Sequence, residues 1–183
     1  NVGAKYLIKE LGPCNIIFSN SDIIIKGEKD LKVLSSDIND TVAVVGPVIS
    51  EQGRYNRGWK LPSTNTEILL NLPLISRYFK KKLLYYKESH FKKDISYVDV
   101  VSGCFFMVDS EALEKVDYFD ETTFLYYEEQ ILAKKMKNIN KKECIDNRVK
   151  IIHDHSVTID KNVKKINKYK ILKTSQKYYV EEY

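Results

Sequence analysis

The sequence lacks any long hydrophobic run, because no apolar stretch approaches the roughly 20 residues that are needed to cross a bilayer. Its start shows no signal-peptide pattern. Proline and glycine are scarce, with 4 and 7 residues in 183, which argues against a disordered or repeat-built protein. The three cysteines, Cys14, Cys104 and Cys144, are odd in number and too far apart for metal-ligand spacing. We therefore expect reduced thiols in a cytoplasmic protein.

A chain of 183 residues with 43% hydrophobic content is long enough for one domain with a substantial core. Its 30 basic and 25 acidic residues leave a net charge of +5, with much of the excess in residues 80–82 and in the tail from residue 161. Such a surface suits a phosphorylated ligand or an anionic membrane, and it is also typical of a solvated lysine-rich face. Nucleic-acid binding is not expected, because no nucleic-acid motif accompanies this modest charge.

Strand-like and helix-like segments alternate along the chain, which is typical of the α/β class. Apolar runs predict strands at residues 15–18, 23–25, 42–45, 94–101, 104–108 and 150–153. Helical spacing predicts helices at residues 4–11, 28–38, 65–89, 111–116, 127–138 and 161–183. We predict a single domain over residues 1–183, with a mixed, mostly parallel sheet flanked by helices and a helical tail from residue 161.

Several local features sharpen this prediction. The strand at residues 15–18 is expected to be buried, and the valine-rich strand at residues 42–45 to be buried on both faces. Pro73 is expected to split the long helix, and Ser110 to cap the next one. Residues 50–64 are expected to form a long polar loop that carries Trp59, the only tryptophan, and loops of this length are often functional.

A polar triplet, Asn20-Ser21-Asp22, lies between two apolar runs and is expected at the end of a strand. In an open α/β sheet, ligands bind at the carboxyl ends of strands. Mg²⁺ keeps several waters and is bound by one or two carboxylates together with substrate phosphates, so Asp22 alone is chemically sufficient. The triplet is also good turn chemistry, which is the alternative interpretation.

The densest acidic stretch, residues 117–132, combines five carboxylates with five aromatic residues. Glu128 and Glu129 are expected in the first turn of a helix, where the helix dipole favours the ionised form that a general base needs. Apolar residues follow both glutamates at helical spacing, so both border the buried side of that helix. The alternative is an ordinary amphipathic helix with an acidic first turn.

Two further candidate segments follow predicted strands. In His153-Asp154-His155, an extended backbone directs both histidines to the same side, where they can ligate a metal or bind phosphate. Exposed or structural histidines are the alternative there. Gly103 follows Ser102 between two strands, and such a glycine often marks a bend or the close approach of a ligand or of another strand.

Taken in order, these segments resemble the inverting GT-A-type glycosyltransferases of the rhamnosyltransferase-like family, which build bacterial cell-surface polysaccharides. The resemblance covers nearly the whole chain. The matching segments are Asn1-Val2-Gly3-Ala4, Asn20-Ser21-Asp22, residues 98–105 with Ser102-Gly103, Phe119-Asp120-Glu121, residues 124–129, His153 and His155 with Ser156, and residues 175–179. The family's metal motif falls on the triplet, where Asn20 replaces a first aspartate.

The resemblance implies a GT-A-like, Rossmann-like fold and transfer with inversion from a dTDP- or UDP-sugar to a saccharide or lipid-linked saccharide. It implies a Mg²⁺ or Mn²⁺ ion, for which Asp22, His153 and His155 are the candidate ligands. The catalytic base falls on Glu129, with Glu128 beside it, and which of the two acts stays open. The candidate donor- and acceptor-binding residues are Asn20, Trp59, Ser102, Gly103, Asp120, Glu121 and Tyr127.

Members of that family begin with a strand-helix-strand unit that holds the nucleotide base, and we expect this domain to be N-terminally truncated relative to them. A non-catalytic remnant or partner subunit that binds nucleotide or saccharide is therefore the alternative to an active enzyme. The lysine- and tyrosine-rich tail suggests peripheral contact with the inner face of the membrane. The alternative for the tail is packing of Ile166, Ile171 and Leu172 on the domain.

Overall fold

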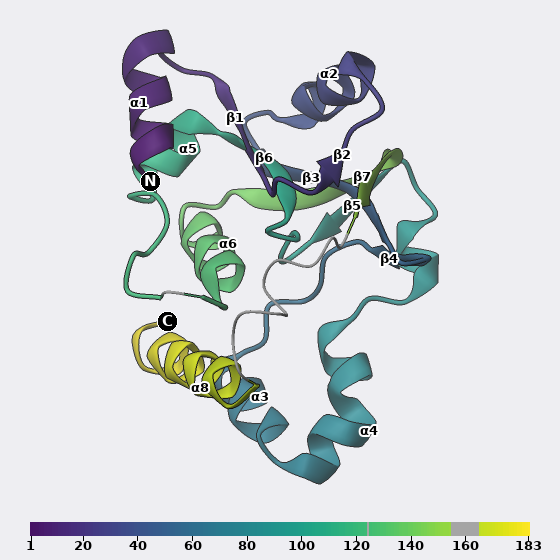
Figure 1. Cartoon of the computed structure of the whole chain (residues 1–183), viewed down its shortest axis with the longest axis vertical. Coiled ribbons are helices and arrows are strands. Elements are labelled where there is room, and N and C mark those ends of the chain that lie inside the picture. Colours follow the sequence, from purple (N-terminus) through teal and green to yellow (C-terminus); the bar gives the residue numbers. More distant parts are fainter. Residues whose placement is uncertain (124, 155–164) are drawn as a thin grey trace.

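Helices pack around one central sheet in the computed structural model, which describes residues 1–123, 125–154 and 165–183, without the side chains of residues 165 and 166 (Figure 1). The helices are α1 (Val2–Leu11), α2 (Glu28–Asp37), α3 (Thr64–Leu70), α4 (Pro73–Leu84), the 3-10 turn η1 (Glu88–Phe91), α5 (Ser110–Lys115), α6 (Glu128–Asn138) and α8 (Lys165–Glu182). The strands are β1 (Asn15–Ser19), β2 (Ile23–Ile24), β3 (Val42–Glu51), β4 (Arg54–Asn56), β5 (Ile95–Val98), β6 (Phe105–Asp109) and β7 (Lys142–His153). The predicted α/β class is confirmed.

Within the described residues, seven strands form one mixed sheet in the order β1-β6-β3-β7-β2, with β4 paired to β3 and β5 paired to β7. The two longest strands, β3 and β7, run parallel to each other, and the other pairs are antiparallel. Because β6 runs antiparallel to both β1 and β3, its start lies at the edge of the sheet where β1, β3 and β7 end. This edge is where the polar candidates of the sequence converge.

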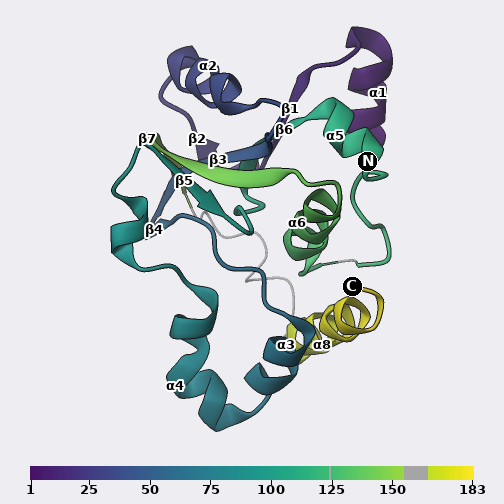
Figure 2. The same ribbon diagram turned by 180° about the vertical axis from the view of Figure 1, so that it is seen from behind.

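The core has two layers, one on each face of the sheet. Side chains alternate across β3, so Val44 and Val48 pack with residues of α1, α5 and α6, whereas Val45 and Ile49 pack with Leu34 of α2. Residues 42–49 are all buried. The prediction of a strand buried on both faces is confirmed, and Figure 2 shows α2 and α6 on opposite sides of the sheet.

The prediction that residues 15–18 are buried is wrong. They form β1, which lies at an edge of the sheet, and only Ile16 of this strand is buried. The expected loop at residues 50–64 contains β4, which pairs with the end of β3. Strand β7 begins at Lys142, well before the start predicted at residue 150. The prediction missed its first half because Glu143 and Asp146, which are buried there, interrupt the apolar pattern by which a buried strand is recognised.

Of the two residues predicted to set helix boundaries, Pro73 does so and Ser110 does not. Pro73 splits the long helix as predicted and occupies the start of α4. The cap of α5 is Asp109, whose carboxylate accepts hydrogen bonds from the N–H groups of Glu111 and Ala112. Ser110, the predicted cap, instead accepts a hydrogen bond from the N–H of Cys14 at 2.9 Å.

Helix α8 packs on α3 and α6 through polar and aromatic side chains. Glu67 of α3 is buried, and its Oε2 accepts hydrogen bonds from Tyr127 Oη at 2.8 Å and from Gln176 Nε2 at 2.7 Å. Tyr179 is 2% exposed, and its ring lies 5.2 Å from that of Tyr127. One buried carboxylate of α3 therefore binds both α8 and the residue that precedes α6.

The tail packs on the domain, as the alternative interpretation for it proposed, and its buried contacts are mainly polar and aromatic. Of the apolar residues expected there, Ile171 is half-buried, Leu172 is 37% exposed, and the side chain of Ile166 lies outside the described residues. Among the helices that the structure describes, none has the length and apolar character needed to cross a bilayer.

Tyr179→Ala is expected to loosen α8, because truncating a buried aromatic side chain leaves a cavity and costs about 3–5 kcal/mol. Amide hydrogen exchange, measured by mass spectrometry, should rise along α8 and at Tyr127. Tyr169→Ala on the same helix is the matched control, because Tyr169 is 58% exposed. Unchanged exchange in Tyr179→Ala would show that this ring does not hold the helix.

Candidate functional site

Polar residues from separate segments meet at the edge of the sheet where β1, β3 and β7 end. The N–H of Asn20, just after β1, donates a hydrogen bond to the carbonyl oxygen of Cys104 at 2.9 Å, which places the triplet beside the segment before β6. Ile23 of β2 pairs with His153, the last residue of β7. The predicted position of the triplet at a strand end is confirmed, and this is the edge at which open α/β sheets bind ligands.

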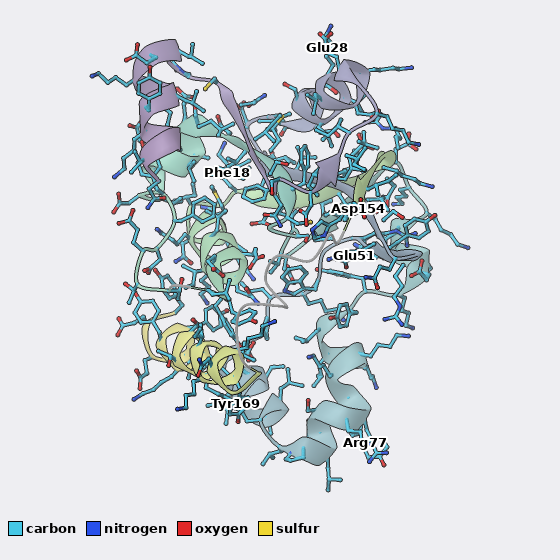
Figure 3. The ribbon with its side chains drawn as sticks, in the orientation of Figure 1. Phe18, Glu28, Glu51, Arg77, Asp154 and Tyr169 are labelled. Atoms are coloured by element: carbon cyan, nitrogen blue, oxygen red, sulfur yellow. The ribbon has the colours of Figure 1, made fainter. Side chains whose placement is uncertain are left out.

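Asp22, His153 and Glu51 form a chain of close polar contacts at this edge. Asp22 Oδ1 lies 3.2 Å from His153 Nε2, and Glu51 Oε1 lies 3.0 Å from His153 Nδ1. The His153 ring is buried between the two carboxylates, and Glu51 is labelled in Figure 3 near the end of β7. Because a carboxylate lies at each ring nitrogen, the geometry favours His153 as a group that orients Asp22 over a direct metal ligand.

The carboxylate of Asp22 can hold a divalent cation only together with phosphate oxygens of a bound substrate and with water. Within residues 1–123, 125–154 and 165–183, no three or more His, Cys, Asp or Glu side chains gather as a metal site. The partly exposed carboxylate of Asp22 matches the way Mg²⁺ is held by one or two carboxylates, phosphates and water. His155 lies outside the described residues, so its metal contact stays a prediction.

Glu129 lies directly against the backbone of Gly103. Its Oε1 accepts a hydrogen bond from the Gly103 N–H at 3.2 Å. A β carbon at position 103 would overlap Oε1 and would lie 2.9 Å from Cδ and 3.0 Å from Cγ of Glu129. The group that closely approaches Gly103 is therefore the carboxyl group of Glu129 in α6, whereas a ligand or another strand was expected there. The contact joins two of the residues that the sequence singled out.

Burial raises the pKa of both glutamates at the start of α6. For Glu129, the negative charge of Glu128 adds to the rise, while hydrogen bonds from backbone N–H groups oppose it. Burial also raises the pKa of the Cys104 thiol, and the charges of Glu51 and Glu129 both contribute to that rise. Both carboxylates therefore lie near the Cys104 thiol, which belongs to the same segment as Gly103 and whose carbonyl oxygen binds the Asn20 N–H.

The turn that leads into α6 has an unusual backbone. Tyr126 and Tyr127 adopt left-handed conformations, with φ of 71° and 72°, which are unfavourable for bulky residues. The hydrogen bond from Tyr127 Oη to Glu67 and the one from Ser175 Oγ to the carbonyl oxygen of Leu125 at 2.8 Å hold this turn. These contacts fix the position at which α6, and with it Glu129, begins.

Asp120, Glu121 and Tyr127 have protein partners in the structure. Asp120 accepts hydrogen bonds from Tyr178 Oη at 2.8 Å, Tyr183 Oη at 2.6 Å and the Thr122 N–H at 2.8 Å. Burial alone would raise the pKa of Asp120, but these hydrogen bonds lower it to about 2. Glu121 accepts a hydrogen bond from Asn1 Nδ2 at 2.7 Å. These contacts anchor Asn1, Tyr183 and α8, and ligand contact through Asp120, Glu121 and Tyr127 stays a prediction.

Trp59 and Ser102 lie beside the Gly103 segment. Trp59 and Val100 exchange two backbone hydrogen bonds of 3.0 Å. Ser102 Oγ accepts a hydrogen bond from Asn56 Nδ2 at 3.4 Å and lies 3.4 Å from Cys104 Sγ. Ser102 directly precedes Gly103, and Trp59 is paired with Val100 in the same segment. Contact of either residue with donor or acceptor stays a prediction. Phe124 lies outside the described residues.

Two acidic residues were missed by the sequence reasoning. Glu51 ends β3, just after the buried run of that strand. A polar residue after an apolar run is the same pattern that singled out Asn20-Ser21-Asp22 after β1, so it could have indicated Glu51 as well. Glu143 is buried in β7, where Oε2 accepts a hydrogen bond from the Val101 N–H at 2.8 Å and Oε1 has no hydrogen-bond partner among the described residues.

A cavity of about 460 Å³ lies beside Glu143, between the end of α6 and β5, and none of the sequence candidates lines it.

Comparison with known proteins rests on structure. No family model matches the sequence, and no curated protein matches it. The fold is similar to that of GalNAc-T7, a GT-A glycosyltransferase solved with UDP, GalNAc and Mn²⁺, with a TM-score of 0.57 at 10% sequence identity. The match covers 83% of this chain and 29% of that one, so this chain spans less than a third of that structure's length. At this identity the likeness concerns the fold, and the predicted GT-A-like fold is confirmed.

Gly103→Ala is expected to displace the Glu129 carboxyl group, because the added methyl overlaps it, and overpacking costs about 1–3 kcal/mol. In a Glu129→Ala background the same change should cost little. A double-mutant cycle measured by urea unfolding should therefore show coupling of about 1 kcal/mol or more. Strictly additive effects would mean that another group fills the space at position 103.

Glu143→Gln is expected to stabilise the protein more at pH 8 than at pH 5. Burial raises the pKa of Glu143 well above 4.5, so the folded state keeps a proton that the unfolded chain loses, and stability falls as pH rises through this window. Glutamine cannot ionise and still accepts the Val101 hydrogen bond. Urea unfolding at both pH values tests this, with Glu111→Gln on the exposed side of α5 as the control. A gain that does not change with pH would contradict the ionisation argument.

Proposed function

We propose that this chain is the acceptor-side part of a glycosyltransferase that moves a sugar, with inversion, from a dTDP- or UDP-sugar to a saccharide acceptor. The observation that carries the proposal is the carboxyl group of Glu129, held against Gly103 at the sheet edge that also carries Asp22. The GT-A-like fold supports sugar transfer from a nucleotide sugar in general, because a transferase of that fold was solved with UDP, GalNAc and Mn²⁺. Inversion rests on the resemblance of the sequence motifs alone.

Glu129 is the proposed general base. The acceptor hydroxyl gives its proton to this carboxylate while its oxygen bonds to the anomeric carbon, and the bond from that carbon to the diphosphate oxygen breaks. Burial raises the pKa of Glu129, which suits a base that must be ionised yet accept a proton. The hydrogen bond from the Gly103 N–H orients the carboxylate. Glu128, the adjacent residue with a similarly raised pKa, is the second candidate.

Asp22 is the proposed residue on the donor side. With His153 and Glu51 behind it, its carboxylate is oriented at the strand end where a nucleoside diphosphate would lie. Asp22 would hold Mg²⁺ or Mn²⁺ together with the diphosphate, and such an ion neutralises the charge that develops on the leaving group. Asn20 and Ser102 flank this position and are the proposed contacts to the donor.

The biological setting is also part of the proposal. The sequence resemblance points to bacterial cell-surface polysaccharide synthesis, with a saccharide or lipid-linked saccharide as the acceptor and peripheral contact with the inner face of the membrane. A non-catalytic nucleotide- or saccharide-binding subunit remains the alternative function.

The test is release of nucleoside diphosphate from UDP- and dTDP-sugars in the presence of Mg²⁺ or Mn²⁺ and saccharide acceptors. Glu129→Gln is expected to lower kcat by about 10²–10⁴-fold, the range that general-base catalysis contributes. Asp22→Ala should weaken metal-dependent binding of nucleoside diphosphate, measured by calorimetry. Glu111→Gln, on the exposed side of α5, serves as the control.

The outcomes separate the alternatives. A large loss in Glu128→Gln with little change in Glu129→Gln would assign the base to Glu128. Activity should also fall at acidic pH with a midpoint above 4.5, since the pKa of the base is raised. Intact turnover in both Glu129→Gln and Asp22→Ala would overturn these roles. Metal-dependent binding of nucleoside diphosphate without any turnover would favour the non-catalytic alternative.

A further inference from the structure

Helix α4 exposes large apolar side chains along its length. None of its residues is buried, and Leu74, Tyr78 and Phe79 are 73%, 66% and 52% exposed. The preceding segment adds Ile68, Leu69 and Leu72, which are also exposed. Contiguous apolar surface of this kind marks an interaction site on a folded protein.

The apolar residues of α4 lie on one side of the helix. Leu74, Tyr78 and Phe79 are spaced four and five residues apart, which places them within one broad stripe of a helix with 3.6 residues per turn. Arg77 and Lys81 lie within one turn of these residues and border the stripe. Lys82 lies within this stripe, between Tyr78 and Phe79, and Ile75 on the same stripe is half-buried. The part of the stripe that faces solvent is therefore formed by Leu74, Tyr78 and Phe79, with basic residues among and beside them.

The charge of α4 has a single sign. The helix carries Arg77, Lys80, Lys81 and Lys82 and contains no aspartate or glutamate. Within the part of the chain that the structure describes, these four cations form no ion pair. Four uncompensated cations beside an apolar stripe are complementary to a surface that is anionic at its outside and apolar beneath.

The helix lies at one end of the molecule. In both ribbon views α4 projects away from the sheet, and α3 is the helix next to it (Figure 1, Figure 2). Figure 3 shows Arg77 at the outer end of this projection and Tyr169 of α8 on the same end of the molecule. A flat surface can therefore approach α4 without contacting the sheet edge that carries Asp22.

We propose that α4 and the segment before it, residues 68–84, dock the protein on an anionic lipid bilayer. Leu74, Tyr78 and Phe79 enter the interface between headgroups and acyl chains, and Arg77 and Lys80–Lys82 contact the lipid phosphates. This assigns membrane contact to α4 and not to the tail, whose buried side is occupied by Glu67 and Tyr127. The proposal is independent of sugar transfer, although it would bring a lipid-linked acceptor close to the domain.

The test is co-sedimentation of the full chain with vesicles of phosphatidylcholine, with and without phosphatidylglycerol. We expect pelleting with the anionic vesicles that decreases as salt is added. Lys80→Glu/Lys81→Glu should lower the partition coefficient at least tenfold. Lys26→Glu/Lys29→Glu, which changes the net charge equally at exposed positions near α2, should stay within twofold of the unchanged protein.

A second pair of variants tests the apolar stripe. Leu74→Ser/Tyr78→Ser should also weaken vesicle binding tenfold, whereas Val2→Ser/Tyr6→Ser on α1, where both residues are exposed, should not. Equal losses in the α4 and control variants, or no binding to anionic vesicles, would overturn the proposal. Self-association in ultracentrifugation that Leu74→Ser/Tyr78→Ser abolishes, without vesicle binding, would assign the stripe to a second copy of the chain. Because no nucleotide sugar is present, these results do not depend on the transferase proposal.

Discussion

The start of α6 depends on a buried carboxylate that belongs to another helix. Glu67 of α3 binds both Tyr127, at the start of α6, and Gln176 of α8. Without those bonds, nothing local favours two consecutive tyrosines in the left-handed region. The position of Glu129 is therefore set by tertiary contacts of the tail, and α8 is part of the support of the site although it contributes none of the residues proposed for chemistry.

Much of the fold could be predicted from local patterns. The valine run of β3, the proline at the start of α4 and the two glutamates at the start of α6 each produce a signal within a few residues. Strand β7 was predicted too short because Glu143 and Asp146 are buried through specific partners, the Val101 N–H and Arg148, which lie outside any apolar pattern. β1 was predicted as buried because an apolar composition does not reveal whether a strand has one neighbour or two.

In the candidate site, too, some residues could be recognised from the sequence, whereas others required the tertiary contacts. Asn20, Asp22, Gly103 and Glu129 were recognisable from their order in the chain, and the structure brings them to one edge of the sheet. Asp120 and Tyr127 come from the same acidic stretch, yet their partners are the tail and α3, and that distinction requires the packing of α8. Glu51 needed the register of β3 and β7, because only that pairing places it against His153.

The contact between Gly103 and Glu129 also constrains how this fold can vary among related chains. A side chain at position 103 leaves no room for a glutamate at position 129 in its present conformation. Alanine at the first position would therefore favour a shorter residue at the second, and the two positions, 26 residues apart in sequence, are expected to change together. The two positions are thus expected to covary, because the backbone of the segment before β6 contacts the carboxyl group at the start of α6.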